Sequence, residues 1–383
     1  MYQIMTPGPT EVPENVRMAR STSCTNPDLD PEFYDFYRET AQQISSLVET
    51  DGETLILSGE GILGLEAVCA TLTETGDRVL ILDNGVFGRG FQDFVKIYGG
   101  DPILYTTDYK KPIDPAALEN FLREDHNYKY ATLVHCDTPS GMLNDVGALC
   151  PVLKKYGILT VVDSVSAMFG NPLHMDAWGI DFLCGGSQKA LSAPPGLTFV
   201  SVSRDGKKEM DDRKTPVASF YANLKTFDGW YEKQWFPYTM PISDIYGLRA
   251  ALDNLREDTD LLGRHRRIAE AVRRALVRSG LGLHLEDGFS DTVSVFDVPE
   301  GMRAKDILDT MLENYHIMLA GSFDVLAGQV IRIGHMGNNA REDKIQAVMR
   351  ALDGTFESLD HPLSCSLEKA YLESLADMDS GKQ

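Results

Sequence analysis

Leu159–Asp163 (LTVVD) is a short apolar run that ends in a carboxylate, and Asp181–Lys189 (DFLCGGSQK) contains a second such run and ends in an amine. Continuous apolar runs of this length are typical of strands that are buried on both faces of a parallel sheet. Similar runs recur through the first half of the chain, and we expect strands at Thr54–Leu57, Arg78–Leu82, Tyr130–His135, Leu159–Asp163, Asp181–Cys184 and Leu197–Val202.

Amphipathic stretches with helical spacing lie between these apolar runs. Strands that alternate with helices build βαβ units and a parallel sheet. The sequence therefore predicts an α/β fold with a mostly parallel sheet, whose helices include Gly64–Thr73, Gly90–Tyr98, Pro115–Arg123 and Gly147–Tyr156.

The pattern changes after Trp235–Pro241 (WFPYTMP). A long helical region is expected from about residue 244 to 279, and its basic stretch Arg264–Arg267 is interpreted as a solvated helix face. Two more strands (Thr292–Phe296, Val330–Gly334) and two helices (Ala304–Tyr315, Arg341–Leu352) indicate a smaller α/β domain. We expect an N-terminal arm (1–14), a large domain (15–258), a small domain (259–360) and an acidic helical tail (361–383).

Length, charge and cysteine usage narrow the class of protein. A chain of 383 residues suits two domains, and a net charge of −21 disfavours nucleic acid and anionic membranes as partners. No apolar segment is long enough to span a membrane, and Met1–Pro9 lacks the features of a signal peptide, so the cytoplasm is the expected location. The six cysteines form no CxxC pair, so neither disulfides nor a metal site is expected.

Glycine-rich and polar segments follow the expected strands directly. Because ligands of open α/β sheets bind beyond the carboxyl ends of the strands, these segments are candidate binding sites. Ser58–Gly64 (SGEGILG) opens a helix, where backbone N–H groups can receive an anion, although glycines there can also serve only a tight bend. Phe87 lies between glycines, where core packing is the commoner role of an isolated aromatic. His135–Gly141 (HCDTPSG) gathers more hydrogen-bonding groups than a turn requires.

Asp163 and Lys189 are expected at neighbouring strand ends. A structural ion pair would explain both residues equally well. The chemistry of pyridoxal also needs both, because a lysine must form the imine and move protons while a carboxylate keeps the pyridine nitrogen protonated.

Taken together, these segments resemble the class V aminotransferases of fold type I, in particular the alanine–glyoxylate and serine–pyruvate aminotransferase group. The resemblance runs from Thr6–Pro9 (TPGP) to Arg332–Gly337 (RIGHMG), and its most specific parts are Val162–Ser166 (VDSVS) and Ser187–Gly196 (SQKALSAPPG). It implies a large domain with a mostly parallel seven-stranded sheet, a small C-terminal α/β domain, and pyridoxal 5′-phosphate as the cofactor.

The resemblance assigns roles around the cofactor ring. Lys189 would be the Schiff-base lysine and the general acid/base, and Asp163 would be the partner of the pyridine nitrogen. Phe87 and Val165 match the residues that pack on the two faces of the ring. Thr138 matches the hydrogen-bond partner of its phenolic oxygen.

The phosphate end of the cofactor is assigned to two segments. Gln188 and Gly61 match phosphate contacts, and Glu60 and Ile62 of the same turn are expected beside the cofactor. Thr239 matches a contact that the family supplies from the neighbouring subunit, so a homodimer with shared active sites is implied.

The substrate is assigned to Arg332, which matches the arginine that clamps its carboxylate in a fork geometry. With no second arginine evident for a side-chain carboxylate, we expect a small neutral donor such as alanine or serine. The expected acceptor is a small 2-oxo acid such as glyoxylate or pyruvate, in a ping-pong cycle.

The chain departs from the family pattern at the phosphate end. Glu60 replaces a small hydroxyl residue, and Phe236 replaces a tyrosine of the partner subunit that contacts the cofactor. Both changes resemble pyridoxamine–pyruvate transaminase, a relative that uses unphosphorylated pyridoxamine, but Ala320–Val325 lacks the second carboxylate-binding arginine of that relative. We expect a bound phosphate first, because helix N–H groups alone can hold it and Glu60 can point to solvent or cap a helix.

Other functions on the same fold are less well matched. A lyase or a desulfurase is the alternative within enzymes, but desulfurases of this class usually place a histidine where this chain has Gln188, and they need a mobile loop cysteine that the sequence does not identify. A non-catalytic pyridoxal binder would not need Lys189, Asp163 and Arg332 together.

Overall fold

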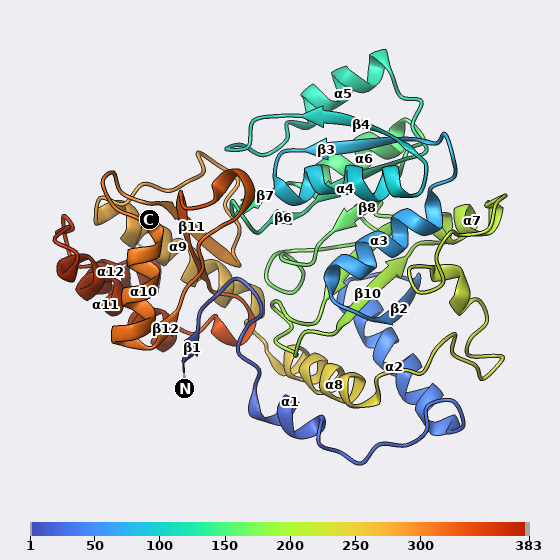
Figure 1. Ribbon diagram of the computed structural model, residues 1–383, viewed down its shortest axis with the longest axis horizontal. Helices are drawn as coiled ribbons and strands as arrows, with labels where there is room; N and C mark the ends of the chain where they lie inside the picture. The colour runs from blue at the N-terminus through green and yellow to red at the C-terminus, as the bar shows by residue number, and fades with distance from the viewer. Residues whose placement is uncertain (1, 380–383) are drawn as a thin grey trace.

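The computed structural model describes residues 2–379, and within them a seven-stranded sheet forms the centre of the larger part of the molecule (Figure 1). Its strand order is β2-β10-β9-β8-β5-β3-β4, and β10 alone runs antiparallel to its neighbours. The predicted α/β fold with a mostly parallel seven-stranded sheet is confirmed. The strands are β2 (Glu53–Ser58), β3 (Arg78–Asp83), β4 (Asp101–Thr106), β5 (Tyr130–Val134), β8 (Leu159–Asp163), β9 (Phe182–Gly186) and β10 (Leu197–Val202).

Within the seven-stranded sheet, β4 is the strand that the sequence did not predict, and it forms an edge of the sheet. Its residues are mostly half-buried, and Pro102 cannot donate a backbone hydrogen bond, which restricts it to an edge. The inner strands β5, β9 and β10 are buried along their whole length, which explains their continuous apolar runs.

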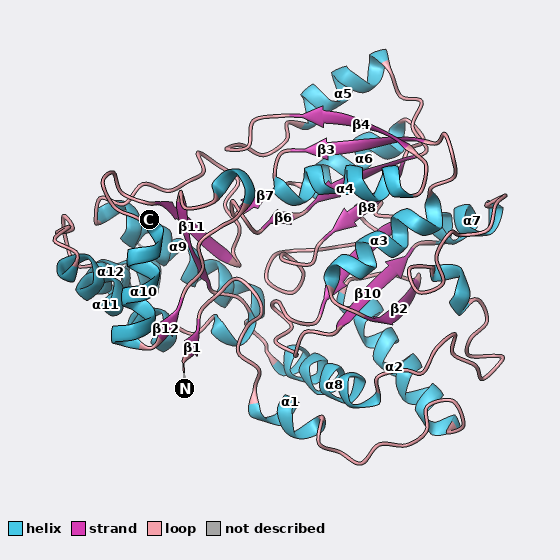
Figure 2. Ribbon diagram, viewed as in Figure 1, coloured by secondary structure: helices cyan, strands magenta, loops and turns pink. Residues whose placement is uncertain are grey.

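Helices cover both faces of the sheet (Figure 2). On one face α3 packs on β9 and β10, and α4 packs on β3 and β4, while α6 contacts β8 and α5 on the other face. Helices α1, α2 and α7 were not predicted. The helices of this part are α1 (Glu14–Ala19), α2 (Pro31–Leu47), α3 (Gly61–Leu72), α4 (Val86–Ile97), α5 (Pro115–Glu124), α6 (Val146–Lys155), α7 (Arg204–Asp212) and α8 (Ile242–Glu257).

A second hydrophobic core lies in the C-terminal part of the chain. It is built around an antiparallel pair, β11 (Val293–Asp297) with β13 (Val330–Gly334), and a short pair of β1 (Gln3–Ile4) with β12 (Ile317–Met318). Its helices are α9 (Leu261–Arg278), α10 (Ala304–Tyr315), α11 (Glu342–Ser358) and α12 (Leu367–Asp379). The two cores agree with a large and a small domain, and the exact boundaries stay predictions.

The helical region expected over 244–279 is two helices, α8 and α9. Asp258 interrupts it: its side chain accepts from the Asp260 backbone N–H and holds the Arg264 guanidinium, which competes with helical hydrogen bonding. The solvated-face interpretation of Arg264–Arg267 was partly wrong, because His265 is fully buried and its Nε2 accepts from the Gly337 N–H.

The N-terminal arm connects the two cores. After β1 pairs with β12, the Gly334 N–H donates to the Met5 carbonyl, and the Thr10 N–H donates to the Gln188 carbonyl beside Lys189. The arm therefore crosses from the small core to the turn that carries the lysine.

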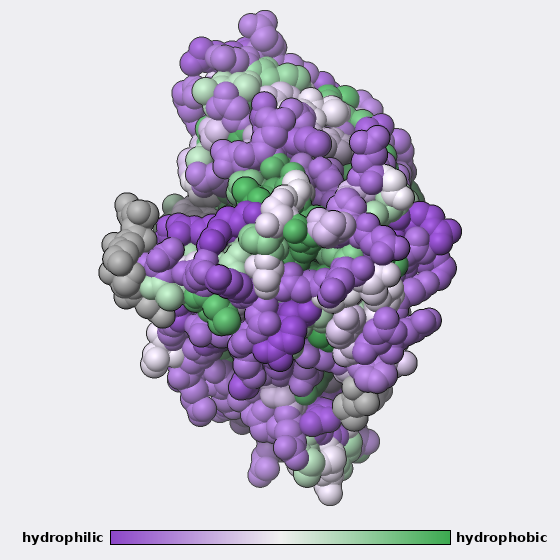
Figure 3. Space-filling model, turned by 90° about the vertical axis from the view of Figure 1, so that its left-hand side faces the viewer, coloured by the Kyte–Doolittle hydropathy of each residue, from purple (hydrophilic) through white to green (hydrophobic). Residues whose placement is uncertain are grey.

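The surface of the small core is mainly hydrophilic, with apolar side chains gathered near the middle of the face in Figure 3. Within residues 2–379, no helix is both long enough and apolar enough to cross a membrane. Of the predicted tail 361–383, α12 accounts for Leu367–Asp379, and residues 380–383 lie outside the described part.

Candidate active site

A cavity opens at the carboxyl ends of the central strands, between the turn after β2 and the turns after β8 and β9. This is the edge at which open α/β sheets bind ligands. Most residues predicted for the cofactor lie here together. The cavity is lined by Glu60, Gly61, Ile62, Leu65, Phe87, Cys136, Thr138, Asp163, Val165, Ser166, Gln188 and Lys189.

Lys189 lies half-buried in this cavity. Its Nζ donates to the Pro7 carbonyl of the N-terminal arm at 2.7 Å. Burial and, to a smaller extent, the charge of Arg332 lower the pKa of the amine to about 8, although Cys136 and Asp163 act in the opposite direction. A large share of this amine is therefore neutral at mildly alkaline pH, as a nucleophile or base requires.

Asp163 ends β8 and is 5% exposed. Its Oδ1 accepts from the Val165 N–H at 2.9 Å, and burial raises the pKa of the carboxyl to about 6. In the described part of the chain, neither Asp163 nor Lys189 forms an ion pair within 4.0 Å, so the structural ion pair considered above is not formed. A buried carboxylate without a cation is costly, which suits a site that receives one.

The walls of the cavity come from two turns. Phe87 lies in the first turn of α4, and its N–H donates to Asp137 Oδ1 at 2.9 Å. Val165 packs on Gly61, where a Cβ atom would lie 3.0 Å from both methyl groups of the valine. A flat ring bound in the cavity can therefore pack against the aromatic side chain of Phe87 and the branched aliphatic side chain of Val165.

Thr138 shares a hydrogen bond with Ser166 through their hydroxyl groups. Ser166, Cys136 and Leu65 line the cavity although the sequence did not assign them a role. Cys136 lies in His135–Gly141 and Ser166 in Val162–Ser166, two segments that the sequence analysis singled out. Their position directly after a strand could therefore have predicted that they line the cavity. Leu65 gave no signal that separates it from core packing.

The phosphate end of the predicted site is the N-terminus of α3. Glu60 is its N-cap, and the Glu60 carboxylate accepts from the Ile62 N–H at 3.2 Å, so the glutamate caps the helix. Gln188 Oε1 is buried and has no hydrogen-bond partner in the described residues. This end of the cavity thus combines the Glu60 carboxylate with a Gln188 amide oxygen that has no hydrogen-bond partner.

Arg332 projects from β13 of the small core toward the cavity residues. Its Nε donates to the Gly321 carbonyl at 2.5 Å and its Nη1 to the Thr138 carbonyl at 3.3 Å. Burial lowers the pKa of the guanidinium to about 10. No carboxylate of the described residues pairs with Arg332, so it presents a half-buried positive charge to an incoming anion.

Phe236 and Thr239 are not brought to this cavity within the chain. Phe236 is 3% exposed and stacks on Tyr34 at 4.6 Å in an aromatic core, so this side chain has little surface to offer to a second subunit. Thr239 is exposed, and its hydroxyl donates to Asp28 Oδ2 at 3.4 Å.

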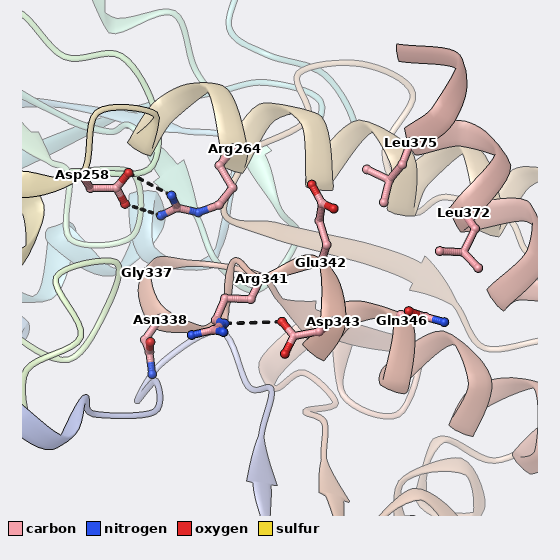
Figure 4. A pocket seen from close by; sticks show the side chains of 10 residues that line it. All are labelled: Asp258, Arg264, Gly337, Asn338, Arg341, Glu342, Asp343, Gln346, Leu372 and Leu375. Carbon is pink, nitrogen blue, oxygen red and sulfur yellow. Dashed lines mark hydrogen bonds and ion pairs between the residues drawn. The ribbon is translucent and has the colours of Figure 1, made fainter. Parts of the chain in front are cut away.

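A second hollow lies elsewhere, along the starts of α9 and α11 (Figure 4). Its charged side chains largely neutralise one another, because Arg264 pairs with Asp258 and Arg341 with Asp343. It contains none of the residues that the sequence assigned to cofactor or substrate. The cavity with Lys189 is therefore the candidate active site.

Comparison with known proteins agrees with this site. The sequence profile described as Aminotransferase class-V matches residues 13–347. The alanine–glyoxylate aminotransferase of Callithrix jacchus is 31% identical over 369 residues, covering 94% of this chain and 87% of that protein. The pyridoxamine–pyruvate transaminase of Mesorhizobium japonicum is 30% identical over 358 residues, covering 92% of this chain and 91% of that protein.

The fold has close counterparts among solved structures. The ureidoglycine–glyoxylate aminotransferase of Bacillus subtilis superposes with a TM-score of 0.94 at 26% sequence identity. The superposition covers 98% of each chain. Both parts of the molecule are therefore shared.

Proposed function

The chain belongs to the class-V aminotransferase family and is a transaminase, and on this premise we propose that it transfers an amino group from alanine or serine to glyoxylate or pyruvate. The family is generally dependent on pyridoxal phosphate. We propose the same cofactor here, in a ping-pong cycle.

The residues of the cavity fit a pyridoxal ring. Lys189 offers a half-buried, partly neutral amine for the aldehyde carbon, and Asp163 offers a buried carboxylate that lacks a cation and can hold the pyridine nitrogen protonated. Phe87 and Val165 would pack on the ring, and Thr138 would bind its phenolic oxygen. When bound, the cofactor supplies an electron sink that makes the α-proton of an amino acid removable.

The chain's own groups would then bind substrate and move its proton. Arg332 would hold the α-carboxylate with paired N–H donors. Lys189 Nζ, released from the cofactor, would take and return the α-proton, and the Pro7 carbonyl at 2.7 Å would orient it.

The single observation that carries the proposal is Arg332, a half-buried guanidinium without a carboxylate partner among the described residues, which donates to the carbonyl of Thr138, a lining residue of the cavity that contains Lys189. One such clamp suits an amino acid whose only carboxylate is the α-carboxylate. The test is a screen of alanine, serine, aspartate and glutamate against glyoxylate and pyruvate. We expect the neutral donors to dominate, and comparable turnover of glutamate would contradict the proposal.

A second candidate is transfer from unphosphorylated pyridoxamine to pyruvate. It is favoured by Glu60, whose carboxylate already accepts from the Ile62 N–H where a phosphate would be received. A carboxylate beside a phosphate dianion is unfavourable, whereas it accepts a hydrogen bond from a hydroxymethyl group readily. Protein that retains no pyridoxal phosphate and forms pyridoxal from pyridoxamine and pyruvate would establish this alternative.

A desulfurase or another lyase reaction is less well supported. Cys136 is the cysteine that lines the cavity, and burial raises the pKa of its thiol to about 12. A thiol that stays protonated at neutral pH is a poor nucleophile. We also propose a homodimer, with Thr239 as the exposed residue that reaches the partner's site.

A further inference from the structure

Asp137 is a buried charge that the reaction described above does not use. It ends β6 (Cys136–Asp137), directly before Thr138, and has no exposed surface. Its carboxylate accepts from the Phe87 N–H at 2.9 Å and from the Ser140 hydroxyl at 2.7 Å. In the described part of the chain it forms no ion pair within 4.0 Å. No nearby cation therefore offsets the free energy that is needed to bury this charge.

One effect of Asp137 is to cap α4 from outside the helix. The N-cap of α4 is Gly85, which has no side chain to accept from the free N–H groups of the first turn. A Cβ atom on Gly85 would lie 2.4 Å from Asp137 Cγ, so the carboxylate occupies the space that glycine leaves open. The contact fixes the backbone of Phe87, the aromatic wall of the cavity.

A second effect is electrostatic. The negative charge of Asp137 raises the pKa of Arg332 against the lowering that burial causes. The two residues are also joined through the chain, because Arg332 Nη1 donates to the carbonyl of Thr138, the next residue. An anion that binds Arg332 therefore arrives within the field of Asp137.

We propose that Asp137 is a positioning residue that holds Phe87 in place through its backbone and weakens the grip of Arg332 on the substrate carboxylate. The inference rests on the proposed function, in which Arg332 is the carboxylate clamp. A weakened clamp favours turnover, because binding the ground state more tightly lowers KM without raising kcat.

The test is Asp137→Asn, which keeps the shape and an acceptor for the Phe87 N–H but removes the charge. The probe is propionate, titrated by calorimetry into the holoenzyme. We expect the variant to bind propionate about three- to tenfold more tightly, as the loss of a nearby like charge in an interior of moderate dielectric implies. Its KM for alanine should fall in parallel, and kcat should not rise.

The matched control is Asp83→Asn, the same change at a fully buried carboxylate that ends β3. It should leave propionate affinity within about twofold, since Asp137 is the charge that acts on Arg332. If Asp137→Asn does not fold, Asp137→Ser removes the same charge and serves in its place.

Unchanged or weaker propionate binding in the Asp137 variant would overturn the inference. A purely structural cap predicts the weaker result, because Phe87 would loosen. Failure of the proposed function is seen separately, as wild-type enzyme without alanine turnover or as propionate binding that survives Arg332→Gln.

Discussion

Replacing Asp163 with asparagine should stabilise the cofactor-free protein while abolishing most of its activity. Burial raises the pKa of this carboxyl from 3.8 to about 6. Between those pH values the folded protein retains a proton that the unfolded chain has released, so stability falls as pH rises through this window. Above pH 6 the full penalty is present, and about 2 pKa units correspond to about 3 kcal/mol.

Asparagine has no charge to bury, and its Oδ1 can still accept from the Val165 N–H at the position of the present 2.9 Å bond. The variant should therefore gain up to about 3 kcal/mol at pH 7.5 and roughly half of that at pH 5. Transaminase activity should fall by about a hundredfold or more, because no carboxylate remains to protonate the ring nitrogen.

The assay is thermal unfolding of cofactor-free wild type and variant at the two pH values. The exposed Asp93 on α4 provides the control, because Asp93→Asn makes the same chemical change without burial and should alter stability little at either pH. A variant less stable than wild type at pH 7.5, or a gain equal at both pH values, would refute the reasoning.

Two substitutions and one pH dependence test other features of the site. Arg332→Gln should raise the KM for alanine by about tenfold to a hundredfold, with a smaller change in kcat, in steady-state kinetics, because charged hydrogen bonds to the carboxylate are lost. Since the pKa of Lys189 is lowered to about 8, the rate at which cofactor-free protein captures pyridoxal should rise between pH 7 and 9 rather than near 10. Gly8→Ala should reduce both stability, by about 1–3 kcal/mol, and activity, because Gly8 has a φ of +95° and a Cβ there would lie 2.4 Å from Lys189 Cδ.

The sequence predicted the centre of the fold well because local pattern and tertiary environment agree there. Buried parallel strands are continuous apolar runs, and the residues that follow them meet at one edge, so Asp163, Lys189, Thr138 and Phe87 could be placed together. The edge strand β4 was missed because a half-buried strand has no such run.

Contacts between distant segments could not be predicted from local pattern. The carbonyl of Pro7 reaches Lys189 only because the arm is held by β12 and Gly334, and Arg332 meets Thr138 only through the packing of the two cores. Nothing in the sequence shows that Asp137 caps a helix that begins beside Gly85. Such contacts depend on how helices and strands pack against one another. The spacing of residues along the chain does not predict that packing.

Phe236 shows a different limit, because matching its position to a family pattern did not predict how its ring packs within its own chain. The match put it at the cofactor of a partner subunit, whereas its ring packs among Tyr34 and Trp230 within its own chain. The tyrosine of the family pattern differs by one hydroxyl, and without it the ring has no polar atom to satisfy in this core.

The central claim is that Lys189 carries pyridoxal phosphate covalently. Borohydride reduction of the purified protein, followed by peptide mass mapping, tests it most directly. We predict one phosphopyridoxyl group fixed on the Nζ of Lys189 and loss of activity in step with its formation. An unmodified Lys189 peptide after reduction of protein supplied with pyridoxal phosphate, or an adduct on another lysine, would contradict the account.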